Sequence, residues 1–129
     1  MNEYYMKMAL NLAKKALKYN EVPVGAIIVK DGKIIAKAYN KKEKTHNVTK
    51  HAEIIVISKA CRKLKNWRLE NCEIYVTMEP CMMCSGAIEQ SRLKKIVYGV
   101  KNENCNCYRR KLRYGTGICP ATSRVCAGG

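Results

Sequence analysis

Residues 76–88 read V-T-M-E-P-C-M-M-C-S-G-A-I and place Cys81 and Cys84 three residues apart, directly after Pro80. Residues 72–77 before them have the composition of a strand, and the apolar residues after them indicate a helix. If Pro80 opens that helix, both thiols lie in its first turn, where free N–H groups and the helix dipole favour thiolate. Two thiols at this spacing can bind one metal ion together. Alternatively, they could form a redox-active pair, or they could be half of a structural zinc site.

A second motif, His51-Ala52-Glu53, stands at the start of another apolar segment. Three N/S ligands and one open position describe a catalytic zinc, and His51, Cys81 and Cys84 supply three such ligands. Glu53 lies two residues from His51, so its carboxylate is suited to carrying a proton rather than to binding the metal. Zinc makes hydroxide available near neutral pH, which suits hydrolytic deamination of an amidine-like carbon in a base. H-x-E followed by P-C-x-x-C is the signature of zinc deaminases.

The remaining periodicities predict an alternating order of elements. We expect helices over residues 3–19, 51–64 and 81–92, and strands over 24–30, 33–39, 72–77 and 95–100. A hairpin followed by two helical crossovers gives an α/β fold with a mixed sheet and helices on its faces. The last two helices begin near the carboxyl ends of strands, where active sites of open α/β sheets gather. The two zinc motifs can therefore converge.

Composition narrows the function classes. The chain has 129 residues, enough for one compact domain, and no apolar run that could span a membrane or serve as a signal peptide, so a cytoplasmic location is expected.

The formal net charge of the chain is +15, from 25 Lys and Arg against 10 Asp and Glu. This excess favours a polyanionic partner, with a lysine-rich genomic composition as the alternative. Candidate phosphate contacts are Lys41, Lys42, Lys44, Arg92 and the cluster around Arg109.

The last quarter of the chain differs from the rest. Eight cysteines are many for this length, and without a visible secretion signal they do not indicate disulfides. Half of them fall in the last quarter, namely Cys105, Cys107, Cys119 and Cys126. Unpaired reduced thiols are favoured there over a second zinc site. We expect a deaminase domain over residues 1–101 and an atypical basic, Cys-rich tail over 102–129 that is irregular or truncated.

From about Met8 to Gly99 the chain resembles the bacterial tRNA-specific adenosine deaminases, which belong to the cytidine-deaminase-like superfamily. The segments that carry the resemblance are E-V-P-V-G-A (21–26), Y-N (39–40), H-A-E-I (51–54), Y-V-T (75–77), E-P-C-M-M-C (79–84), S-G-A-I (85–88) and S-R (91–92). The first of these distinguishes this family from deaminases of free bases and nucleosides better than the zinc ligands do. From Asn102 onward the sequence departs from the family's further strand and long terminal helix.

The resemblance implies a three-layer α/β/α fold with a central mixed sheet and one Zn²⁺ per chain. It implies His51, Cys81 and Cys84 as metal ligands and Glu53 as the catalytic proton carrier. Asn40 would hydrogen-bond the flipped-out adenine, and Val24 would form one wall of the pocket that holds the base. The family makes inosine at the wobble position of a tRNA anticodon stem-loop and works as a homodimer.

Two other functions fit the same zinc motifs. The chain could deaminate free guanine, cytosine or a nucleotide, because the zinc chemistry would be identical and only the pocket would differ. It could also be an inactive RNA-binding protein that keeps its zinc and has a decayed C-terminus. The deamination of adenosine in tRNA is the function that the complete set of motifs favours.

Overall fold

The computed structural model of the chain describes residues 3–100. In chain order the elements are α1 (Glu3–Lys18), β1 (Gly25–Lys30), β2 (Lys33–Tyr39), α2 (Lys42–Thr45), α3 (Ala52–Leu64), β3 (Cys72–Met78), α4 (Met82–Gln90) and β4 (Lys95–Val100). The segment expected to form a tail, residues 102–129, lies outside the described residues. No helix within residues 3–100 combines the length and the apolar character that crossing a membrane requires.

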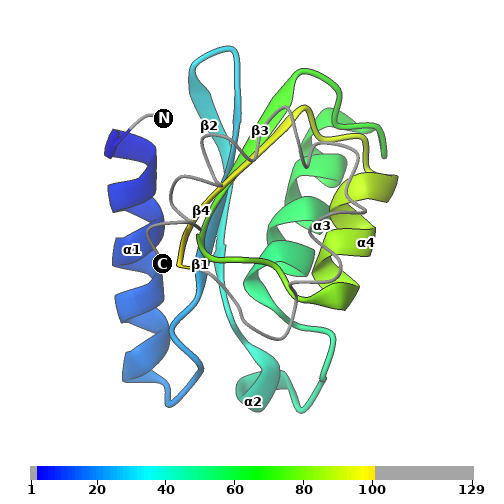
Figure 1. The fold of residues 1–129 in the computed structure, drawn as a ribbon. Helices are drawn as coiled ribbons and strands as arrows, with labels where there is room; N and C mark the ends of the chain where they lie inside the picture. The colour runs from blue at the N-terminus through cyan, green and yellow to red at the C-terminus, as the bar shows by residue number, and fades with distance from the viewer. Residues whose placement is uncertain (1–2, 101–129) are drawn as a thin grey trace.

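The four strands form one mixed sheet in the order β2-β1-β3-β4. β1 pairs antiparallel with β2 and with β3, whereas β3 and β4 are parallel and are joined through α4. α1 covers one face of the sheet, and α3 and α4 cover the other (Figure 1). The expected α/β fold with three α/β/α layers and a central mixed sheet is confirmed.

Alternation along the strands builds a separate core on each face of the sheet. In β1, Ala26 and Ile28 belong to the larger core, which contains the buried α3 residues Val56 and Ala60. Ile27 and Val29 point the other way, into the smaller core beneath α1. Because side chains of a strand alternate between faces, a strand that is apolar throughout must be covered on both sides.

The topology also brings the two zinc motifs to the same edge. β2 and β3 run in the same direction because each is antiparallel to the strand between them. Their carboxyl ends therefore lie at one edge of the sheet, and α3 and α4 both begin there (Figure 1). The convergence of residues 30 positions apart thus follows from strand order.

Two local expectations were wrong. No helix or strand was expected between residues 39 and 51, but this stretch contains the short helix α2. Cys81 was expected inside the first turn of α4, but it is the N-cap residue in extended conformation and the helix begins at Met82. Pro80 therefore precedes the cap rather than opening the helix. The other predicted elements are confirmed, with ends that differ by at most two residues.

Gly25 lets α1 pack closely against β1. A Cβ atom there would overlap the Ala9 carbonyl oxygen and lie 2.7 Å from the Ala13 nitrogen and 2.8 Å from Leu12 Cβ. Two of these atoms belong to the helix backbone, which cannot move aside as a side-chain tip can. A glycine at this position therefore fixes the distance between helix and sheet.

Replacing Gly25 by alanine should lower the free energy of unfolding by about 3 kcal/mol, because α1 would have to move away from the sheet. Gly86→Ala is the matched control, since nothing lies within 4 Å of a Cβ at Gly86. Alanine there should be neutral or stabilise by up to about 1 kcal/mol, as expected within a helix. Urea denaturation of both variants measures the difference, and equal stabilities would contradict the packing argument.

Candidate metal centre and active site

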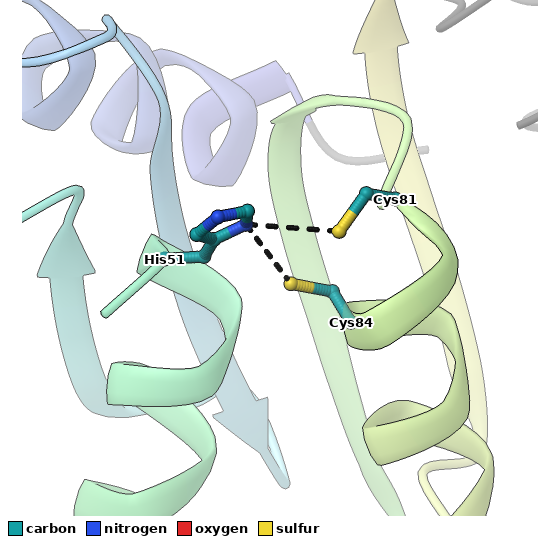
Figure 2. A group of neighbouring side chains, drawn as sticks. All are labelled: His51, Cys81 and Cys84. Carbon is teal, nitrogen blue, oxygen red and sulfur yellow. Dashed lines mark hydrogen bonds between the residues drawn. The ribbon is translucent and has the colours of Figure 1, made fainter. Parts of the chain in front are cut away.

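His51, Cys81 and Cys84 come together where α3 and α4 begin. His51 is the N-cap of α3 and Cys81 the N-cap of α4, both with extended backbone and neither with its side chain bonded to the cap. The His51 Nδ1 atom lies 3.7 Å from Cys81 Sγ and 3.6 Å from Cys84 Sγ. Figure 2 shows the ring nitrogen facing both sulfur atoms.

The separations between these ligand atoms fit a single metal ion. All three atoms lie within 4.8 Å of one another. A tetrahedral zinc bound at about 2.1 Å by nitrogen and about 2.3 Å by sulfur would hold the two ligand atoms about 3.6 Å apart. One nitrogen and two sulfur donors are a set that zinc favours. The residues present therefore fit zinc by both donor chemistry and spacing.

The two thiols do not ionise alike in the chain without an ion. A hydrogen bond from Cys84 lowers the pKa of Cys81 to about 5, helped by the backbone N–H groups of Cys84 and Met83 and by the charge of His51. The same hydrogen bond, together with burial, raises the pKa of Cys84. The pair therefore holds one thiolate and one thiol, and a bound metal would take the place of the shared proton.

Glu53 lies beside this cluster in the first turn of α3, and its side chain is only 4% exposed. Burial raises the pKa of its carboxyl to about 7, and the nearby charge of Cys81 adds to the increase. A carboxyl with a pKa near the operating pH can both accept and return a proton. Its position and its pKa are those that a general acid–base group needs.

A cavity of about 130 Å³ opens onto the cluster. It is lined by Val22, Val24, Asn40, Lys42, His51, Glu53, Met78, Glu79 and Cys81. Five of the six predicted site residues thus share one cavity, and the sixth, Cys84, is fully buried behind it. Val24 is itself 6% exposed, as expected for an apolar wall.

Asn40 is buried, and the oxygen of its side-chain amide is already hydrogen-bonded. Its Oδ1 atom accepts a hydrogen bond of 2.7 Å from the N–H of Ala52, the first residue of α3. Within residues 3–100 no hydrogen bond engages its amide nitrogen, so two donor positions remain for a molecule in the cavity. Sequence reasoning anticipated a contact with a base but not this link to the helix that carries Glu53.

Several residues near the site were not predicted. Glu79 is 4% exposed and lines the cavity, and its place directly before Pro80 was the only local signal. The buried Glu21 carboxylate accepts hydrogen bonds from the backbone N–H groups of Glu43 and Lys44, at 3.0 and 2.7 Å. Arg92, by contrast, was predicted as a phosphate contact. It follows the C-terminal end of α4, whereas Cys81 precedes the N-terminal end.

A buried carboxylate beside a cluster of one histidine and two cysteines, at the edge of an α/β/α fold, defines the class of zinc-dependent deaminases. The family model described as the cytidine and deoxycytidylate deaminase zinc-binding region matches residues 1–100. The chain belongs to this family, and its cofactor is zinc.

Proteins similar to this chain include the tRNA-specific adenosine deaminases of Aquifex aeolicus and Bacillus subtilis, with 53% and 47% identity over 74% and 82% of the chain. The matches span 64% and 66% of the length of those two relatives. A structure from a study of A-to-I editing by tRNA:A34 deaminases is 42% identical with a TM-score of 0.76, covering 78% of this chain and 77% of its own. The guanine deaminase of Bacillus subtilis is 36% identical with a TM-score of 0.77, covering 86% and 76%.

The lowered pKa of Cys81 predicts an acidic thiolate in the protein after its metal is removed with a chelator. Thiolate absorbance in the ultraviolet should rise with a midpoint at about pH 5, because Cys84 donates its hydrogen bond to Cys81. This step should be absent in Cys81→Ser and unchanged in Cys61→Ser, a half-buried thiol outside the cluster. A wild-type titration with no step below pH 7 would refute the assignment.

Proposed function

We propose that this chain catalyses the hydrolytic deamination of adenosine to inosine at the wobble position of a tRNA anticodon. The observation that carries the proposal is the buried Glu53 carboxyl beside the ligand cluster, in a cavity that also contains the Asn40 amide. The similarity to tRNA-specific adenosine deaminases at 53% and 47% identity supports this substrate. The net charge of +15 is consistent with a nucleic acid.

In this proposal His51, Cys81 and Cys84 hold the zinc ion. When bound, zinc acts as a Lewis acid that makes hydroxide available near neutral pH. At its carboxylate, Glu53 would carry the two protons of the attacking water, one to a ring nitrogen and one to the departing amine. A C–O bond forms at C6 of adenine, the C6–N bond breaks and ammonia leaves, so that the ring becomes that of inosine.

Asn40 and Val24 would recognise the base. Because the Asn40 Oδ1 atom is bonded to Ala52, the side chain offers its N–H donors to an acceptor on the edge of the base. Val24 would pack against the ring as an apolar wall. These two residues flank the cavity from the start of β1 and the end of β2.

We also propose that the protein acts as a homodimer on cytoplasmic tRNA. Met82 and Met83, at the start of α4 beside the cluster, are 55% and 38% exposed, which is high for apolar side chains next to an active site. Size-exclusion chromatography with light scattering tests the dimer, and a monomer at micromolar concentration would refute it.

Glu53→Gln should bind zinc as the wild type does and lose deamination by at least about a hundredfold, because glutamine cannot carry the proton. Incubating the zinc-loaded protein with an anticodon stem-loop and measuring inosine and ammonia tests this. Glu89→Gln, at the other end of α4, is the control and should be fully active. An active Glu53→Gln variant would eliminate the proton-carrier role.

The same assay separates the competing functions when free guanine, cytosine and cytidine are supplied beside the stem-loop. The 36% identity to a guanine deaminase makes free guanine the strongest competitor. Turnover of a free base alone would overturn the tRNA substrate. A folded, zinc-loaded protein that binds RNA and deaminates none of the substrates would indicate a decayed enzyme.

Asn40→Asp should keep the fold and lose activity, because aspartate can still accept the Ala52 N–H but offers no donor to the base. Asn40→Ala should lose activity and also about 1 kcal/mol of stability, since the Ala52 N–H loses its partner. Thermal unfolding and the stem-loop assay together distinguish the two effects. Full activity of Asn40→Asp would show that the amide donors are not used.

A further inference from the structure

Two tyrosines stack at the end of the sheet that carries the candidate active site, on the face covered by α1. The rings of Tyr19 and Tyr39 are nearly parallel, at 10°, with centroids 6.1 Å apart. The ammonium groups of Lys15 and Lys41 lie 5.9 and 5.2 Å from the centroid of Tyr39, and that of Lys44 lies 5.4 Å from Tyr19. These five residues form a lysine–tyrosine cluster.

Contacts with the rest of the fold hold this cluster in place. The Glu21 carboxylate accepts the N–H groups of Glu43 and Lys44 and so fixes α2, which carries Lys44. The backbone N–H of Lys41 donates to the Lys50 carbonyl at 3.0 Å. A lysine held over an aromatic ring has less freedom than a free surface lysine, so less entropy is lost when it binds an anion.

The three lysines carry positive charge that no carboxylate neutralises within residues 3–100. Arg68 and Glu70 form an ion pair elsewhere in that range, and none of the three lysines takes part in one. The Glu21 carboxylate is buried and already bonded to the backbone of α2, and Glu43 of α2 forms no ion pair with any of the three lysines. Three ammonium groups around one stack repel one another, and a ligand with several negative charges would relieve that repulsion.

The cluster adjoins the cavity through the chain itself. Tyr39 directly precedes Asn40, and Lys41 follows it, while Lys42 lines the cavity. Asn40 turns towards α3, whereas Tyr39 turns to the other face of the sheet, where α1 ends. Consider a nucleic acid with one nucleotide in the cavity. Its backbone would pass the lysines if it continued around the sheet edge that β2 forms.

We propose that the lysine–tyrosine cluster binds the phosphates of the RNA strand next to the adenosine that enters the cavity. Each ring has the other tyrosine beside it and at least one lysine ammonium group over it, so in this proposal the tyrosines position the ammonium groups rather than stack on bases. This inference rests on the proposed function, because it assumes that the ligand at the cavity is RNA. It adds Lys15, Tyr19 and Tyr39, which no zinc motif or charge run singles out.

Binding of a fluorescent anticodon stem-loop to the zinc-loaded full chain tests the proposal by anisotropy at several salt concentrations. The variant K15Q/K41Q/K44Q should bind about tenfold more weakly, and the slope of log K against log salt should fall by about 2, as expected for three lost phosphate contacts with single strands. The matched control K7Q/K63Q/K94Q removes the same charge from exposed lysines elsewhere and should bind within about twofold of wild type. Equal losses in the two triple variants would overturn the proposal.

Two further variants test the role of the rings. K15R/K41R/K44R should bind within about twofold of wild type, because arginine also lies well over aromatic rings and binds phosphate. Tyr19→Leu keeps every charge and should weaken binding about threefold, because Lys44 loses the ring beneath it. Failure of the arginine variant to bind, or full affinity of Tyr19→Leu, would refute a cluster organised by the tyrosines.

Separate readouts distinguish this proposal from the proposed function. In the deamination assay K15Q/K41Q/K44Q should raise KM for the stem-loop and leave kcat unchanged, because the lysines do not touch the reacting atoms. Deamination with an unchanged KM and unchanged affinity would refute the cluster and leave the function standing. Binding that depends on the cluster, without any inosine formed, would refute the function and leave the cluster standing.

Discussion

The antiparallel pairing of β1 with both of its neighbours is the constraint on which the site depends. Ala26 is opposite Ala38 of β2 on one side and Val76 of β3 on the other. The ends of β2 and β3 are therefore level and two strand spacings apart, about 10 Å. α3 and α4 both start from this edge, so a histidine from one and two cysteines from the other can reach the same point. A register shift of one residue in either strand pairing would turn the side chains of the shifted strand to the opposite face of the sheet.

Differences in burial and hydrogen bonding set the pKa values of the ionisable groups at this edge of the sheet. Glu53 and Cys84, in the first turns of α3 and α4, are buried and their pKa values are raised, whereas Cys81 at the cap keeps hydrogen-bond donors around it and its pKa is lowered. Three ionisable groups within one small region thus differ in proton affinity because their surroundings differ. The lysines remain outside on the other face, where solvent and the tyrosine rings surround them. If both proposals hold, the sheet separates proton chemistry on one face from the binding of a polyanion on the other.

Much of this arrangement could be predicted from the sequence, because its causes are local. The continuous apolar run of β1, the Asp31-Gly32 turn and the helical spacing in α3 are signals within short windows. The parts that were missed depend on partners far along the chain. α2 has four residues and no periodicity, and Glu21, which fixes it, lies 22 residues before Glu43. The bond from Ala52 to Asn40 likewise joins two elements and leaves no local pattern.

That bond has a consequence for how the cavity can select its occupant. An asparagine amide can usually rotate by half a turn and exchange its donor and acceptor ends. Here the rotation would leave the buried N–H of Ala52 without a partner, at a cost of about 1–3 kcal/mol. The side chain is therefore held in one orientation and presents the same polarity to every molecule that enters. If Asn40 contacts the base as proposed, the contact would favour a ring with a lone pair at that point and disfavour one with a hydrogen there.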